Sequence, residues 1–318
     1  MIDDRAGNES QCLGVAEALG EAFEERRIRY SWMATIPNAL LGATFAGLTP
    51  ESQEQFIPPW PDLVIAAGRR TAPVARKIKR LSGDTTKLVQ IMDPGPAGTG
   101  EFDLMAIPGH DVVTRGRTTI MITGAPHRIT PERLEAAAQH WQSRFAHLPR
   151  PWIALIVGGS TRRRTFEPAL AAELGNMASA MAQQAGGSLL ITTSRRTGTA
   201  AVNLLEEIKV PNFVYRWGDV GENPYMGYLA LADMLVVTGD SVSMCSEACA
   251  TGKPVYIVAP PPFITAKHVR FHQSLYQDGY ARPFTGLYEE WSHPPLNAAD
   301  LIADAIRTMI TNMEREND

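Results

Sequence analysis

The chain has 318 residues, 44% of them hydrophobic and 20% charged, which is enough for about two globular domains. A net charge of -4 argues against a nucleic-acid-binding surface, and three cysteines are too few for a disulfide framework. No stretch approaches the roughly 20 apolar residues of a membrane span and no secretory signal is visible, so we expect a cytoplasmic protein, with peripheral membrane contact left open.

The first half of the chain alternates helical and strand-like segments. It predicts helices over 7–20 and 73–81, and strands over 28–34, 63–67, 87–92, 104–108 and 119–123. A domain of this kind normally opens with a strand, but only three residues precede the loop-like Asp4-Arg5-Ala6-Gly7-Asn8. We therefore expect the first strand to be absent or very short.

The second half has unbroken apolar strands separated by helices. A helix over 131–145, with Thr130 as N-cap, comes first, and strands follow over 151–157, 188–193, 212–217, 234–238 and 254–258. Strands that are apolar on both faces are typical of parallel sheets covered by helices. The pattern predicts an α/β protein of two Rossmann-like domains, with parallel sheets that face each other across a cleft. Their expected bounds are 1–128, a linker helix in 129–150, 151–296, and a last helix in 297–318 that returns to the N-terminal domain.

In open α/β sheets, ligands bind outside the carboxyl ends of the strands, where helix N-termini attract anions. After the first two strands of the second half, glycines allow close backbone approach, and hydroxyls and guanidinium groups suit a phosphate or sugar. These candidates are Gly158, Gly159, Ser160, Arg162, Thr193, Ser194 and Arg195. Trp217 ends the third strand and could stack on a base or belong to the core. A tight structural turn and solvated arginines are the alternatives.

The strongest local signal is Gly239-Asp240-Ser241-Val242-Ser243-Met244, where a buried strand turns into a helix. Asp240 or Ser241 could serve only as the N-cap. The functional interpretation is a phosphate held by Ser241, Ser243 and backbone amides. Glu247, one turn further on, could accept hydrogen bonds from ribose hydroxyls.

Candidates on the first half would face the second half across the cleft. A carboxylate or amide there could orient or deprotonate an acceptor hydroxyl, which makes Asp4, Asn8 and Asp93 the catalytic candidates. The residues expected on the acceptor side are Arg5, Gln11, Gly68 and Arg69. A structural role is the alternative for each of them.

Several motifs are absent from the sequence. Neither G-x-G-x-x-G nor a Walker A motif occurs, which argues against a dehydrogenase or a kinase. His268 and His272 lack the glutamate of a zincin, and Cys245 and Cys249 lack two further ligands, so no metal site is expected. The segment around Ser241 differs from a nucleophile elbow because Ser243 takes the place of the second glycine. A hydrolase with Ser241 as nucleophile stays an alternative.

In combination, these motifs resemble a bacterial and plant family. They are Asp4-Arg5-Ala6-Gly7-Asn8 with Gln11, Gly68-Arg69-Arg70, Gly158-Gly159-Ser160, and the segment from Thr238 to Met244 with Glu247. Its plant members are known as mitochondrial fission (elongated-mitochondria) factors, and bacterial members are often labelled nucleoside-diphosphate-sugar epimerases. The chain lacks the NAD fingerprint and the Tyr-x-x-x-Lys pair of short-chain epimerases, which argues against that label.

More distantly, the layout is similar to glycosyltransferases of the GT-B fold. That resemblance implies a nucleotide-diphosphate sugar as co-substrate, bound in the interdomain cleft, with no tightly bound cofactor. It also implies that Glu247 binds the ribose and that the preceding helix N-terminus binds the diphosphate. We therefore expect a metal-independent glycosyltransferase with an unknown acceptor. The alternative is a non-catalytic adaptor, because the plant fission factors are implied to recruit a dynamin-like partner and because fold does not fix function.

Overall fold

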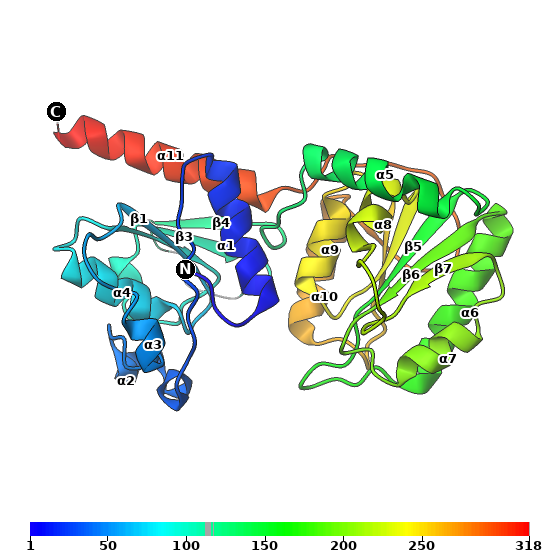
Figure 1. The fold of residues 1–318 in the computed structure, drawn as a ribbon, viewed down its shortest axis with the longest axis horizontal. Coiled ribbons are helices and arrows are strands. Elements are labelled where there is room, and N and C mark those ends of the chain that lie inside the picture. The colour runs from blue at the N-terminus through cyan, green and yellow to red at the C-terminus, as the bar shows by residue number, and fades with distance from the viewer. Residues whose placement is uncertain (112–115, 117, 318) are drawn as a thin grey trace. The chain divides into compact units, whose positions relative to one another are not determined.

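The computed structural model describes residues 1–111, 116 and 118–317. The chain divides into two compact units (Figure 1). The first comprises Met1–Arg128 and Asn297–Asp318, and the second comprises Ile129–Leu296. Each unit is built around its own parallel sheet, which confirms the predicted α/β fold with two parallel sheets.

The first unit holds a four-stranded sheet in the order β1-β2-β3-β4. Its strands are β1 (Leu63–Ala67), β2 (Lys87–Ile91), β3 (Leu104–Pro108) and β4 (Thr119–Ile122). Its helices are α1 (Ala6–Leu19), α2 (Asn38–Leu41), α3 (Pro50–Gln53), α4 (Ala72–Leu81) and α11 (Ala298–Asn317), with 3-10 turns at Trp32–Thr35 and Thr99–Glu101. Alternate strand residues pack on opposite faces. Val89 and Ile91 share a core with α1 and α11, while Leu88 lies on the side of α4.

The prediction of a strand over 28–34 is wrong, because the structure has no strand in this range. Ile28 is nevertheless buried, as a strand residue would be. Instead of a strand, the structure has two isolated bridges here, one from Arg27 to Ile2 and one from Tyr30 to Leu48. The start of this segment pairs with the N-terminal residues, because the amide of Ile28 donates to the carbonyl of Ile2 at 2.9 Å. The amino group of Met1 donates to Ile65 of β1 at 2.9 Å. Before α1, the described residues contribute one isolated bridge, from Ile2 to Arg27.

The second unit holds a six-stranded sheet in the order β10-β9-β8-β5-β6-β7. Its strands are β5 (Trp152–Val157), β6 (Ser188–Thr193), β7 (Asn212–Tyr215), β8 (Met234–Thr238), β9 (Val255–Val258) and β10 (Arg282–Pro283). Its helices are α5 (Pro131–Phe145), α6 (Pro168–Ala185), α7 (Ala200–Glu206), α8 (Tyr225–Leu231), α9 (Val242–Cys249) and α10 (Ala266–Gln277). The five strands predicted here are confirmed, and β10 was missed.

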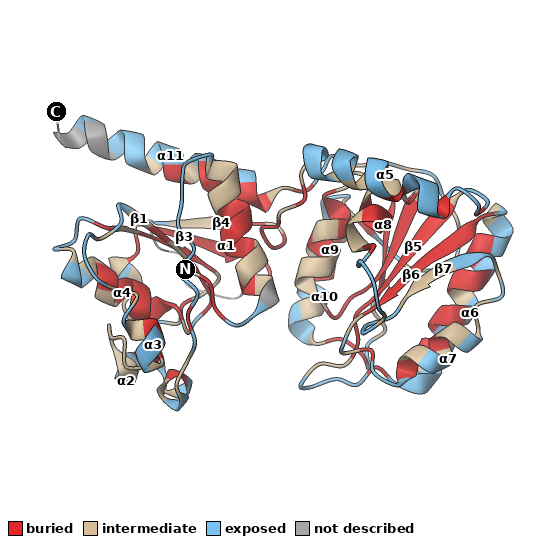
Figure 2. Cartoon of the chain, viewed as in Figure 1, coloured by how far each residue is buried: buried red, intermediate tan, exposed pale blue. Residues whose placement is uncertain are grey.

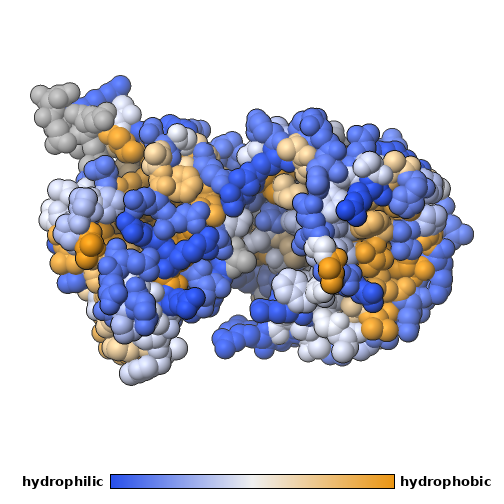
Figure 3. All heavy atoms as spheres, viewed as in Figure 1, coloured by the Kyte–Doolittle hydropathy of each residue, from blue (hydrophilic) through white to orange (hydrophobic). Residues whose placement is uncertain are grey.

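The four central strands of the second sheet, β5, β6, β8 and β9, are buried on both faces, whereas the edge strands β7 and β10 are partly or fully exposed (Figure 2). Ile153 and Leu155 pack with α6, whereas Ala154 and Ile156 pack with α5, α8 and α9. The apolar runs in the sequence follow from this two-sided burial. The visible outer surface is mostly hydrophilic, with hydrophobic side chains gathered on the side of α6 and α7 in the second unit (Figure 3).

Helix α5 is held on the second unit by an aromatic cluster. Thr130 caps the helix by accepting a hydrogen bond from the amide of Arg133 at 3.3 Å. Phe145, fully buried at the other end, contacts Trp141, Trp152 and Tyr228 with ring centroids 5.6–5.9 Å apart. Phe145 therefore joins α5 and α8 to the sheet.

Replacing Phe145 by alanine should lower the free energy of unfolding of the second unit by about 3–5 kcal/mol, because the cavity left inside this cluster cannot collapse. Urea unfolding followed by tryptophan fluorescence measures this change. The matched control is Phe23→Ala, since Phe23 is 48% exposed and its loss should change the unfolding free energy by less than about 0.5 kcal/mol. Equal effects of the two variants would contradict the role given to Phe145.

Candidate functional site

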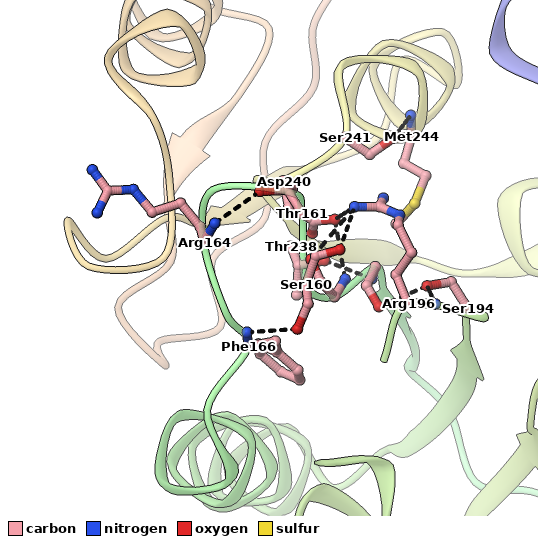
Figure 4. A network of polar contacts seen from close by, with 12 residues as sticks. Ser160, Thr161, Arg164, Phe166, Ser194, Arg196, Thr238, Asp240, Ser241 and Met244 are labelled. Carbon is pink, nitrogen blue, oxygen red and sulfur yellow. Dashed lines mark hydrogen bonds and ion pairs between the residues drawn. The ribbon is translucent and has the colours of Figure 1, made fainter. Parts of the chain in front are cut away.

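The carboxyl ends of β5, β6 and β8 meet at one edge of the second sheet, where a polar network joins the loops that follow them (Figure 4). The amide of Gly158 donates to Thr238 Oγ1 at 2.7 Å, and that of Gly159 donates to Asp240 Oδ2 at 3.0 Å. The turn after β5 is therefore fixed by Thr238, which ends β8, and by Asp240 in the loop that follows.

Both glycines of this turn are required by the protein's own packing. A Cβ on Gly158 would lie 2.4 Å from each carboxylate oxygen of Asp240. Gly159 has a φ of +150°, and its Cβ would lie 2.2 Å from the carbonyl group of Arg196. These glycines thus allow Asp240 and Arg196 to approach the backbone closely. This is the role expected of a tight structural turn, which the sequence analysis gave as the alternative to a ligand contact.

An ion pair lies at the centre of the network. The side chain of Asp240 is 0% exposed, and its Oδ2 lies 2.6 Å from Nη1 of Arg196. The second oxygen, Oδ1, is buried and accepts no hydrogen bond from the residues that the structure describes. Arg196 also donates to the carbonyl of Gly159 at 3.4 Å. The sequence prediction selected Arg195 instead, which is exposed.

The predicted hydroxyl groups support the loops. Ser194 donates to the carbonyl of Gly158 at 2.7 Å, and Ser160 accepts from the amide of Phe166 at 3.0 Å. Thr197, which the prediction missed, also donates to the Gly158 carbonyl. Arg162, by contrast, is exposed.

Helix α9 begins beside this network. Ser241 is its N-cap, since the hydroxyl accepts from the amide of Met244 at 3.3 Å, and Asp240 is not the cap. The first amides of a helix have no acceptor within the helix. The structure describes no acceptor for those of Val242 and Ser243, so these two amides are available to an anion.

Glu247 lies further along α9 and is partly buried. Its Oε2 accepts a hydrogen bond from the hydroxyl of Tyr225 on α8, a partner that the sequence prediction missed. Burial raises the pKa of Glu247, and the bond from Tyr225 opposes this increase only in part. The site thus holds a carboxyl group that is poorly solvated and acts as a hydrogen-bond acceptor.

Trp217 does not belong to the core, because 63% of the residue is exposed. Its backbone is nevertheless fixed, since its amide donates to Thr193 Oγ1 at 3.0 Å. The indole is therefore an exposed apolar surface on a well-anchored loop at the carboxyl edge.

In the first unit, candidates gather around the start of α1 and the end of β1. Asp3, which the prediction missed, is buried and accepts from Asn8 Nδ2 at 3.0 Å and from the amide of Arg5 at 3.1 Å. Asp4 is exposed and pairs with Arg70 at 2.5 Å. Gly68 has a φ of +83°, and its Cβ would lie 3.0 Å from Asn8 Nδ2.

The remaining first-unit candidates are held by local bonds or burial. Arg69 donates to the carbonyls of Ala34 and Ile36 at 3.2 and 3.1 Å. Asp93 Oδ1 accepts from the amide of Gly95 at 2.8 Å, and Gln11 is buried on α1. Arg69 thus fixes the backbone of 34–36, and Asp93 closes its own turn.

Within the described part of the chain, no group of three or more His, Cys, Asp and Glu side chains is placed to hold a metal ion. None of its helices has the length and apolar character needed to cross a membrane. The hydroxyl of Ser241 bonds the amide of Met244, and no bond from it to a histidine is described, so nothing supports the hydrolase alternative.

The fold places the protein in the GT-B-like class. A UDP-GlcNAc 2-epimerase from Methanocaldococcus jannaschii aligns over 97% of this chain and 98% of its own, with a TM-score of 0.53 and 10% identity. MurG from Acinetobacter baumannii aligns over 98% and 92%, with a TM-score of 0.49 and 16% identity. Because an epimerase has this fold, the missing short-chain fingerprint does not argue against every kind of epimerase.

The family model described as mitochondrial fission ELM1 matches residues 6–310. The mitochondrial fission protein ELM1 of Arabidopsis thaliana is 33% identical, over 85% of this chain and 68% of its own. An uncharacterized protein, RP120, of Rickettsia prowazekii is 30% identical over 96% of both chains. The chain therefore belongs to the mitochondrial fission ELM1 family.

Replacing Arg196 by methionine should lower the unfolding free energy by about 3 kcal/mol, because it leaves the buried carboxylate of Asp240 without its counter-charge. Denaturant unfolding measures the loss. Adding Asp240→Asn to this variant should recover part of it, since the uncompensated charge is removed. Arg195→Met, at the exposed neighbour, is the control and should change stability by less than about 0.5 kcal/mol. An equally large loss of stability in Arg195→Met would refute the assignment of Arg196 as the counter-ion of Asp240.

The raised pKa of Glu247 predicts a pH-dependent difference between the wild type and Glu247→Gln. Above about pH 4.3 the unfolded chain releases this proton while the folded protein still holds it. The unfolding free energy of the wild type relative to the variant should therefore fall as pH rises from 4 through the folded pKa. Urea unfolding of both proteins at a series of pH values tests this, and a difference independent of pH would contradict the burial argument.

Proposed function

We propose that the second unit binds the nucleoside diphosphate part of a nucleotide sugar and that the protein transfers the sugar to an acceptor. The observation that carries the proposal is the placement of Glu247 on the helix whose first amides, those of Val242 and Ser243, are available to an anion. A hydrogen-bond acceptor and an anion-binding end thus lie on one short helix, as a ribose joined to a diphosphate requires.

The diphosphate would bind the amides at the start of α9. Arg196 adds little net charge, since Asp240 compensates it at 2.6 Å. The amides and the positive end of the helix would therefore carry the attraction, with a contribution of about 0.3–1 kcal/mol from the dipole at an exposed site. Exposed Arg162 and Arg195 follow β5 and β6 at the same edge and could add charge.

The ribose would bind Glu247. An ionised carboxylate accepts hydrogen bonds more strongly than a protonated one, so two ribose hydroxyls would favour the ionised form. Ligand binding should then lower the pKa of Glu247 and release a proton. The exposed indole of Trp217 would offer an apolar surface to the base.

In the transfer step, an acceptor oxygen would attack the anomeric carbon as the bond from that carbon to the diphosphate breaks. The helix end would stabilise the charge that develops on the departing diphosphate. A base would remove the acceptor proton. Of the three catalytic candidates, Asp4 is the exposed carboxylate, while Asn8 and Asp93 are engaged by Asp3 and Gly95.

The alternative is a non-catalytic adaptor. It is favoured by the engagement of each catalytic candidate in an ion pair or hydrogen bond, and by the plant relative, which is named a mitochondrial fission protein. An adaptor could retain a nucleotide site without transferring a sugar.

Thermal unfolding in the presence of nucleoside diphosphates and nucleotide sugars tests the donor site. A ligand at 100 times its dissociation constant should raise the stability by about 2.7 kcal/mol. The increase should be lost in Glu247→Gln and kept in Glu206→Gln, which changes an exposed glutamate of the same unit. If no nucleotide shifts a cooperative transition, the donor site does not exist.

Titration calorimetry in two buffers of different ionisation enthalpy gives a second measurement. At pH values where the folded protein still holds the proton of Glu247, the wild type should release protons on binding, whereas Glu247→Gln should show no heat of binding. A bound nucleotide sugar that stays intact with every acceptor tested would favour the adaptor, whereas release of the nucleoside diphosphate would favour the transferase.

A further inference from the structure

A cavity of about 480 Å³ opens in the second unit between α6, α10 and the end of β9. Its floor is formed by buried aliphatic side chains, among them Leu174, Val258 and Ile264. Partly exposed Met177 and Phe284 line its sides. Its volume falls in the range of small-molecule sites, about 300–1,000 Å³.

The cavity follows from the shortness of β10. This strand has two residues, which pair with Tyr256 and Ile257, while β9 continues to Val258. The amide of Phe284 still donates to the carbonyl of Ile257 at 3.0 Å, and beyond this bond no described strand pairs with β9 on that side. Helices α6 and α10 pack in different cores, on opposite faces of the sheet, and both reach this gap.

The lining defines the chemistry of a ligand. Most of the lining side chains are aliphatic, aromatic or proline, which suits an apolar body. Glu173 is the one carboxylate among the residues that line the cavity, and it is exposed. The lining residues include neither lysine nor arginine. A cationic or hydroxyl head group would therefore be favoured over an anionic one.

We propose that this cavity binds a small amphiphile with an apolar body and an ammonium or hydroxyl head, the head lying toward Glu173. The cavity is distinct from the proposed nucleotide site, although one of its walls, His272, lies against the loop before α9. A Cβ on Gly239 would be 2.4 Å from Cε1 of His272. Binding is measured without nucleotide, so the proposal stands or falls independently of the function proposed above.

Titration calorimetry of the full chain with octylammonium chloride, 1-octanol and sodium octanoate, each below its aggregation limit, tests the proposal. Octylammonium should bind saturably at one site, and octanoate should bind at least about fivefold more weakly because of Glu173. Glu173→Gln should remove this preference for the cation while octanol binding stays unchanged.

Met177→Trp fills one side of the cavity and should abolish binding, whereas Ala180→Trp, on the exposed face of the same helix, should not. Val269→Trp fills the cavity from α10 and serves if the first variant does not fold. The proposal is overturned if none of the three probes binds saturably, or if binding persists in a folded cavity-filling variant.

Discussion

The carboxylate of Asp240 is removed from solvent at the carboxyl edge of the second sheet, and its neighbours are arranged around that charge. Arg196 neutralises it, the amide of Gly159 donates to it, and Gly158 has no side chain because the carboxylate occupies that space. A buried charge is costly unless it is paired and hydrogen-bonded. This requirement fixes the loops after β5, β6 and β8 relative to one another.

The same interaction limits what the site can do. A guanidinium that is already paired contributes less to the binding of an anion than an unpaired one. A phosphate at this edge would therefore depend on backbone amides and on the direction of α9. A rigid set of loops with little net charge would position a nucleotide rather than attract it over a long distance. Such a site would serve either the proposed transferase or the adaptor alternative.

The sequence predicted the strands of the second sheet because two-sided burial leaves unbroken apolar runs such as 152–157. It did not predict β10, because Arg282 and Pro283 carry no apolar signal and the strand is defined only by its pairing with β9. The segment 28–34 has a strand-like apolar pattern, but it makes one isolated bridge, from Tyr30 to Leu48, and Arg27 just before it bridges to Ile2. Pattern alone does not reveal whether a partner exists.

The sequence prediction selected loops that the structure joins in one polar network, but it did not give the orientation of their side chains. Arg195 and Arg196 are adjacent, and only the backbone course after β6 decides which one meets Asp240. The contact between Tyr225 and Glu247 joins α8 to α9 and has no local signal. The glycines gave the clearest indication of where another group approaches the backbone closely, although the approaching groups belong to the protein itself.

The first unit is discontinuous, and this has a consequence for the order of folding during synthesis. Its core includes Ile302 and Ile306 of α11, which pack with Val15 of α1 and Val89 of β2. These two isoleucines are synthesised after Leu296, the residue at which the second unit ends. The first unit is therefore begun before the second unit and completed after it. Until α11 has been synthesised, the apolar face of α1 that packs against it is uncovered.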